Sequence, residues 1–133
     1  MRSAREQSSG ARKGYGYREL VVWQKGIELA KRIYRVTQSF PNEEKFGLVS
    51  QMRRAAVSVP SNIAEGQARH TTKEFIQFVS HAEGSVAELD TQLRLGVELG
   101  YCKNGETAEI GALIEEMRRM LNGLRRNLLT RTG

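Results

Sequence analysis

Arginine is the side chain with the plainest chemical use in this sequence, because its planar guanidinium group fits phosphate oxygens. Fifteen of the 21 basic residues are arginine. Residues 1–18 carry a net charge of +4 and residues 117–133 a net charge of +5, whereas residues 19–116 carry −3. The whole positive excess of this +6 chain therefore lies at its two ends, where it serves either phosphate binding or solubility.

Nucleic acid is the partner that these basic ends favour. The pairs Arg118-Arg119 and Arg125-Arg126 are seven residues apart, so they repeat along one side of a helix. Such a stripe binds phosphates without reading sequence. Because few aromatic residues are available for base stacking, we expect structured RNA or RNA/DNA to be recognised by shape. The residues predicted to bind nucleic acid are Arg118, Arg119, Arg125, Arg126, Arg2, Arg5, Arg12 and Lys13.

Residues that could support catalysis or bind a metal are scarce. The histidines are His70 and His81, and Cys102 is the one cysteine. One cysteine is too few for a four-cysteine zinc site. A di-iron bundle needs Glu-x-x-His on two helices, whereas here His81 precedes Glu83 and no second such motif exists. His81 and Ser85 are one helical turn apart, so their side chains point in parallel and do not converge as a catalytic triad requires. We therefore expect no enzymatic activity and no cofactor or metal.

The segment 50–66 interleaves polar residues with apolar residues that are poor choices for a solvated helix face. Val57, Val59 and Ile63 are poorly suited to water, so we expect this helix to be covered on two sides, the second by another subunit. Pro60 cannot donate a helical hydrogen bond, and we expect the helix to kink there and to continue.

Ser58 and Asn62 lie one turn apart on either side of Pro60. Because the carbonyl of Ala56 loses its helical donor at the proline, we expect Ser58 or Asn62 to bond to nearby backbone or across a subunit boundary. A ligand-binding role is the alternative. Gly84 and Gly96, farther along the chain, each cost a helix about 1 kcal/mol relative to alanine. They indicate the close approach of a neighbouring helix or of a neighbouring subunit.

Four runs of apolar residues with helical spacing predict four helices, and short connections make neighbouring helices antiparallel. The first run has heptad spacing and ends at Phe40-Pro41. The second helix is expected from Asn42 to Gly66. The third follows a Thr71/Glu74 capping box and stops at Gly100, and the fourth follows a turn at Asn104-Gly105. The predicted core seams are Leu20, Trp23, Ile27, Ala30, Tyr34 and Thr37; Leu48, Met52, Ala55 and Val59; Phe75, Val79, Ala82, Val86, Leu89, Leu93 and Val97; and Ile110, Leu113, Met117, Met120, Leu124 and Leu128.

The predicted fold is therefore an all-α, antiparallel up-down-up-down four-helix bundle over residues 17–130, with its second helix kinked at Pro60. Residues 1–16 are rich in serine, glycine and arginine and are interpreted as a flexible basic arm. No apolar run approaches the ~20 residues of a membrane span, and the first residues lack the apolar stretch of a secretory signal. One cysteine cannot form an intrachain disulfide, which fits the cytoplasmic location that we expect.

Four stretches of the chain resemble a known family. They are LVVWQK at 20–25, FPxxE at 40–44, QMRRAAxSVPSNIAEG at 51–66 and GSxxEL at 84–89. The resemblance is to the four-helix-bundle proteins of intervening sequences in bacterial 23S rRNA genes, and it runs from Tyr17 to Leu128. It implies a cytoplasmic bundle that assembles into a ring, typically a homopentamer, with no assigned catalytic residue. It also implies a fold similar to the accessory variability determinant of diversity-generating retroelements, which binds nucleic acid and a reverse transcriptase.

Two functions follow from the residues and the resemblance together. The first is a non-enzymatic homo-oligomer, with five subunits favoured, that binds nucleic acid. The alternative is a ring-shaped adaptor that docks a protein such as a reverse transcriptase or a ribosomal component through the second helix and the glycines of the third. The residues assigned to the subunit interface or to a structural motif are Arg53, Arg54, Ala56, Val57, Ser58, Pro60, Asn62, Glu65, Gly84 and Ser85. Arg53 and Arg54 are equally compatible with phosphate binding.

Overall fold

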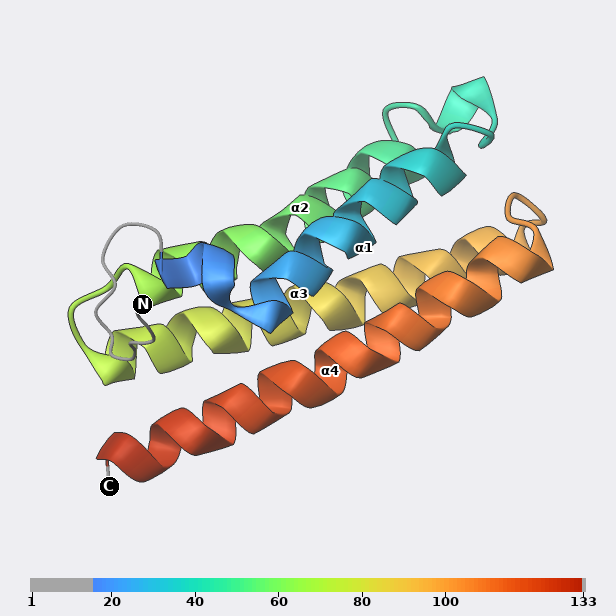
Figure 1. Cartoon of the computed structure of the whole chain (residues 1–133). Helices are drawn as coiled ribbons and strands as arrows, with labels where there is room; N and C mark the ends of the chain where they lie inside the picture. Colours follow the sequence, from blue (N-terminus) through green and yellow to red (C-terminus); the bar gives the residue numbers. More distant parts are fainter. Residues whose placement is uncertain (1–15, 133) are drawn as a thin grey trace.

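Four α-helices form an antiparallel bundle in the computed structural model, which describes residues 16–132 (Figure 1). The family resemblance and the sequence pattern both predicted this fold. A short 3-10 helix, η1, precedes the first α-helix, and a second, η2, precedes α2. The elements are η1 (Gly16–Glu19), α1 (Val21–Thr37), η2 (Asn42–Glu44), α2 (Leu48–Gln67), α3 (Thr72–Glu98) and α4 (Asn104–Thr132). The expected arm lies outside the described residues, with Arg2, Arg5, Arg12 and Lys13, except for Gly16, which begins η1.

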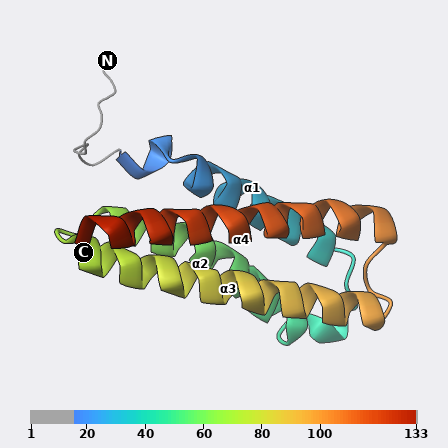
Figure 2. The same cartoon turned by 90° about the horizontal axis from the view of Figure 1, so that it is seen from below.

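The helices lie at the four corners of the bundle in chain order. Each packs against the next, and α4 returns to pack against α1, whereas within residues 16–132 neither α1 and α3 nor α2 and α4 pack together. Figure 2 shows α4 running beside α1 and α3. Because the number of antiparallel helices is even, the beginning of α1 and the end of α4 lie at the same end of the bundle (Figure 1).

The core seam of α1 differs from the predicted seam by a rotation of the helix. Val22, Leu29, Ile33 and Val36 are buried, whereas Ile27 and Tyr34, which were predicted to be core, are 38% and 43% exposed. Of the predicted residues only Thr37 is fully buried; Leu20, Trp23 and Ala30 are partly buried beside the core. The prediction was wrong for this helix because it carries two apolar stripes with the same spacing of three and four residues.

The seams of the other helices follow the prediction more closely. All four residues predicted for α2 are buried. On α3, Phe75 is partly buried and Val97 half-buried, and the rest of the seam is buried. On α4, Ile114 and Leu121 are buried, whereas Leu113, Met120 and Leu124 are only partly buried, because the core-facing stripe is shifted by one residue there.

The helix boundaries also correct the prediction in two places. Asn42 begins η2, and α2 starts only at Leu48, where the backbone N–H donates to Glu44 Oε1 at 3.2 Å. Tyr101 donates to the other Glu44 oxygen at 3.0 Å, and this hydrogen bond raises the pKa of the tyrosine. Asn104 and Gly105 belong to α4 and do not form the connecting turn.

The predicted helix ends of α3 are confirmed. Thr71 Oγ1 accepts a hydrogen bond from the Glu74 backbone N–H, as an N-cap does in a capping box, and also donates to the Glu74 carboxylate, each at 3.1 Å. At the other end, Gly100 has a φ of 79°, the left-handed conformation that glycine favours after a helix.

α2 continues through Pro60, which is buried against α1. A Cβ atom on Gly26 would lie 3.3 Å from Pro60 Cβ, so the absence of a side chain at Gly26 lets α1 approach the proline closely. The kink itself stays a prediction.

Gly66 is the position where a side chain would disturb the fold most. An added Cβ atom would lie 2.7 Å from Phe75 Cδ1 and 2.8 Å from Phe78 Cβ, on α3. We expect Gly66→Ala to lower the free energy of unfolding in urea by about 1–3 kcal/mol, because the helices must move apart. Gly123→Ala, at a helical position with no neighbour within 4 Å, is the matched control and should raise the free energy of unfolding by about 0.5–1 kcal/mol. Equal effects of the two changes would contradict this account.

Candidate functional site

A shallow groove runs along the outward side of α2. Its volume is about 760 Å³, and it is bounded by Tyr34 of α1 and by Lys45 and Phe46 of the loop before α2. Most of the residues assigned from sequence to an interface line it. Its α2 residues are Val49, Ser50, Arg53, Arg54, Val57, Ser58, Ser61, Asn62 and Glu65.

Arg53 is held in place at one side of this groove by neutral groups. Its Nε donates to Thr37 Oγ1 at 2.9 Å and its Nη2 donates to the Tyr34 carbonyl at 3.2 Å. The guanidinium carbon also lies 4.6 Å from the centre of the Tyr34 ring. No carboxylate within the described chain neutralises this side chain, so Arg53 presents a fixed positive charge to the groove.

The other charges of the groove are also mainly positive. Arg54 is exposed and has no polar partner among residues 16–132. Lys45 Nζ lies 5.5 Å from the centre of the Phe46 ring. Glu65 is the one acid in the lining, and its carboxylate already lies 3.7 Å from Arg69. The groove therefore has an unneutralised positive charge that suits an anionic partner.

Large apolar side chains are exposed in and beside the groove. Phe46 is 89% exposed, and Val57 is 42% exposed. Ile27 and Tyr34, from the second apolar stripe of α1, extend this surface along the neighbouring helix. Because α1 and α2 pack side by side, the stripe and the groove form one continuous α1/α2 face. Sequence reasoning missed Phe46, although an aromatic residue between lysine and glycine in a polar connection was a visible signal.

Ser58 and Asn62 bond to nearby backbone, as predicted. The Ser58 hydroxyl is 2.7 Å from the Ala55 carbonyl and 2.6 Å from Ser85 Oγ on α3. Both bonds form together if Ser58 donates to the carbonyl and accepts from Ser85. Asn62 Nδ2 donates to the Ser58 carbonyl at 2.8 Å. These side chains therefore bond to carbonyls on either side of Ala56 and not to its own.

The remaining residues assigned to the interface separate into internal and external positions. Ala56 and Pro60 are buried inside the subunit, so their role is structural. A Cβ atom added at Gly96 would lie 3.1 Å from the Phe40 ring and 3.2 Å from Cys102 Sγ, so packing within the subunit explains this glycine. Gly84 is exposed, and nothing lies within 4 Å of the position its Cβ would take.

The predicted arginine stripe on α4 is half neutralised, because three of its four arginines share the two carboxylates of Glu115 and Glu83. Arg118 donates to both oxygens of Glu115, at 3.0 and 2.9 Å, which lowers the pKa of that carboxyl. Arg119 lies 3.5 Å from the same residue. Arg125 Nε donates to Glu83 of α3 at 2.8 Å. Among the described residues, only Arg126 of the four lacks a polar partner.

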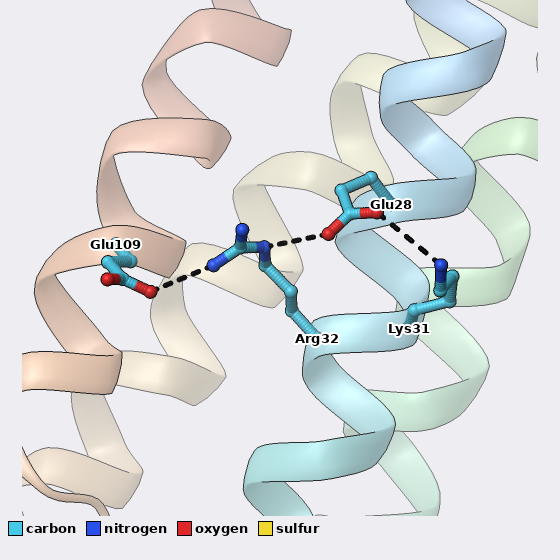
Figure 3. Close-up of polar contacts among 4 residues, drawn as sticks. All are labelled: Glu28, Lys31, Arg32 and Glu109. Atoms are coloured by element: carbon cyan, nitrogen blue, oxygen red, sulfur yellow. Dashed lines mark hydrogen bonds and ion pairs between the residues drawn. The ribbon is translucent and has the colours of Figure 1, made fainter.

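Basic side chains of α1 also form ion pairs with acidic side chains of α1 and α4 (Figure 3). Arg32 donates to Glu28 at 3.0 Å and across to Glu109 of α4 at 2.9 Å, and Lys31 lies 3.7 Å from Glu28. The hydrogen bond from Arg32 lowers the pKa of Glu28, and the nearby Lys31 charge adds to this effect. Because these pairs are exposed, they orient α4 more than they stabilise it.

Exposed cations collect at the end of the bundle where α1 begins and α4 ends. Figure 1 shows the start of α1, the α2–α3 turn and the end of α4 at this end. Lys73, Arg126 and Arg131 are exposed there and have no polar partner within residues 16–132. We call this region the basic end.

Comparison with known proteins decides the family. The family model described as "23S rRNA-intervening sequence protein" matches residues 18–123. The chain belongs to this family. A crystal structure of a protein with unknown function from the S23 ribosomal protein family, from Bacteroides thetaiotaomicron VPI-5482, is similar with a TM-score of 0.74 and 25% identity. The match covers 80% of this chain and 96% of that chain. No curated protein matches the sequence.

The part of the chain that matches the 23S rRNA-intervening sequence protein family contains the whole groove. It also contains Gly84, Ser85, Arg118 and Arg119, but not Arg126 or Arg131. Within residues 16–132, no three histidine, cysteine, aspartate or glutamate side chains are grouped to hold a metal ion. None of the helices in the same span has the length and apolar character needed to cross a membrane.

Removing the Ser58 side chain should lower the free energy of unfolding more than removing the Asn62 side chain does. We expect Ser58→Ala to lower the free energy of unfolding by about 1 kcal/mol, because the half-buried Ser85 hydroxyl loses its partner. Asn62→Ala should change it by no more than ~0.5 kcal/mol, since the Ser58 carbonyl keeps its helical hydrogen bond from the Asn62 backbone N–H. Urea unfolding at one fixed protein concentration measures both variants. A larger loss for Asn62→Ala would contradict this assignment.

Proposed function

We propose that this member of the 23S rRNA-intervening sequence protein family is a non-enzymatic homo-oligomer that binds nucleic acid through its basic end. Structured RNA is the favoured ligand, five subunits the favoured number and the cytoplasm the favoured location. The observation that carries the proposal is a group of exposed cations at one end of the bundle, where Lys73, Arg126 and Arg131 have no acidic partner in the described chain.

Assembly through the α1/α2 face supports the oligomeric part of the proposal. Phe46, Val57 and Tyr34 are exposed together with unneutralised Arg53 and Arg54, a mixture typical of the buried centre of protein interfaces. Covering this face would stabilise the assembly by about 25 cal/mol for each Å² of apolar surface removed from water. The basic end lies at the end of the helices, so assembly through the groove leaves it open to phosphates.

The charge of the assembled protein supports the nucleic-acid part. Each chain has a net charge of +6, and a ring that places the basic ends on one rim adds their fields together. Arg118, Arg119 and Arg125 contribute less than the sequence suggested, because acidic side chains already bind them. The binding surface proposed from the structure is therefore smaller than the predicted stripe and lies nearer the end of α4.

A ring-shaped adaptor for a protein partner is the second candidate. The exposed apolar residues of the α1/α2 face favour it, if the partner that covers them is a different protein. The 260/280 nm absorbance ratio of the purified protein, before and after a high-salt wash, distinguishes the two. Nucleic acid that is removed by salt supports the first proposal.

Val57→Glu tests the assembly surface. We expect the variant to dissociate into helical subunits of 15.0 kDa, because a carboxylate at this position would be buried in the contact. Light scattering measures the mass and far-ultraviolet circular dichroism the helix content. Gln51→Glu, on an exposed α2 position outside the groove, is the matched control and should stay assembled. A wild-type mass of 15.0 kDa at micromolar concentration would refute assembly.

Arg126→Gln/Arg131→Gln tests the basic end. Binding of a labelled RNA hairpin should weaken, and the slope of log affinity against log salt should fall by about 0.7–0.9 for each phosphate that the variant no longer binds. Arg35→Gln/Lys103→Gln is the control, because these exposed cations lie toward the opposite end of the bundle. Equal binding by both double variants would disprove the basic end as the site, and no binding by wild type at low salt would favour the adaptor.

A further inference from the structure

One outward stripe of α3 has a glycine, a carboxylate and exposed leucines that no contact within the described part of the subunit explains. Gly84, Glu88 and Leu95 lie four and seven residues apart, so they share one side of the helix. Gly84 has no neighbour within 4 Å, although glycine costs an exposed helix position about 1 kcal/mol relative to alanine. Leu95 is 48% exposed, and Leu99, one turn farther on, is 49% exposed. This α3 stripe has the small residue and the apolar side chains that a second helix needs for close packing.

Glu88 gives the α3 stripe an unneutralised negative charge. Its one hydrogen bond within the described chain comes from the Gln92 amide, at 3.4 Å. Two other exposed acids on α3 and α4 are paired with arginine, Glu98 with Arg94 and Glu115 with Arg118, whereas Glu88 has no such partner among residues 16–132. Glu88 is therefore a carboxylate without a cation, on a helix face that also exposes leucine.

The α2 groove has the complementary set of groups. Arg53 is fixed by neutral partners, and Arg54 has none among residues 16–132. Phe46 and Val57 expose apolar surface beside these cations. The α2 groove and the α3 stripe thus match in charge and in apolar character, but they lie on the same subunit and face outward from different helices.

We propose that the α3 stripe of a second copy of this chain occupies the α2 groove, with its Glu88 carboxylate bound by Arg54 and Arg53. This inference depends on the homo-oligomer proposed above and names the surface that completes its interface. Gly84 of the second copy allows its α3 backbone to approach the groove closely. Leu95 and Leu99, which lie on the same side of Glu88 along α3, cover part of the apolar surface around Phe46.

The position of the two surfaces fits a closed assembly. The hydrogen bond between Ser58 and Ser85, at 2.6 Å, joins the edge of the groove to the residue beside Gly84, so the surfaces adjoin along the α2–α3 seam. Two different surfaces that bind each other give a heterologous contact, which produces a ring when the rotation between subunits closes. Each subunit then contributes its groove to one neighbour and its α3 stripe to the other.

Charge reversal tests the pairing directly. Arg54→Glu and Glu88→Arg should each raise the concentration at which half the protein is assembled by about tenfold or more, because like charges then meet in the contact. The double variant Arg54→Glu/Glu88→Arg should restore assembly toward that of wild type, since opposite charges meet again. Lys73→Glu and Glu106→Arg, at exposed positions outside both surfaces, are the matched controls and should assemble as wild type. Sedimentation velocity over a dilution series measures assembly, and circular dichroism confirms that each variant is folded.

The outcomes separate this inference from the proposed function. If the wild-type protein assembles and both single variants assemble as well as it does, the Glu88 pairing is overturned. The homo-oligomer itself would still stand. Single variants that dissociate, with a double variant that also stays dissociated, would show that Arg54 and Glu88 do not meet, and would overturn the pairing as well. A wild-type protein that is monomeric at every concentration would refute the homo-oligomer itself.

Discussion

A helix in a four-helix bundle can turn one stripe toward the core, and α1 carries two apolar stripes. Val22, Leu29 and Ile33 take the core position, so Ile27 and Tyr34 are left on the surface beside α2. This rotation of α1 places Tyr34 and Thr37 where they hold the Arg53 guanidinium group without neutralising it. The fixed position of Arg53 and the apolar α1/α2 face both depend on which stripe of α1 faces inward. A rotation of one residue would bury Tyr34 and leave Arg53 without its partners.

The antiparallel arrangement separates the two proposed activities in space. The antiparallel order brings the start of α3 and the end of α4 to the same end of the bundle, which places the exposed cations Lys73, Arg126 and Arg131 there (Figure 1). The groove lies along the side of α2, and the α3 stripe adjoins it. Subunit contacts along the sides and phosphate contacts at the end can therefore form together. Some acidic residues of the middle of the chain are paired with cations, such as Glu28 and Glu109 with Arg32 (Figure 3), which reduces their repulsion of phosphate.

Features encoded by neighbouring residues were predictable from sequence, and features created by the fold were not. The N-cap at Thr71, the stop at Gly100 and the α2 seam depend on residues within a few positions, and the structure has them as predicted. The α1 seam was wrong because periodicity alone does not choose between two equal stripes. The pairing of Arg125 with Glu83 joins residues 42 positions apart, so a count of charges along the chain could not reveal it. By contrast, the Glu115–Arg118 pair has helical i, i+3 spacing and was visible in the sequence.

Hydroxyl-radical footprinting of the wild-type protein, free of nucleic acid, tests most directly whether the α1/α2 face is buried in an assembly. In a single subunit Phe46 is 89% exposed, Val21 is 53% exposed and Tyr34 is 43% exposed. Val21 lies on α1 outside the second apolar stripe and serves as the internal reference. Aromatic rings react faster with hydroxyl radicals than aliphatic side chains do, so an uncovered Phe46 should be oxidised faster than Val21. Burial of the face predicts that Phe46 and Tyr34 are oxidised more slowly than Val21, whereas rapid oxidation of both aromatic residues in the wild-type protein would contradict it.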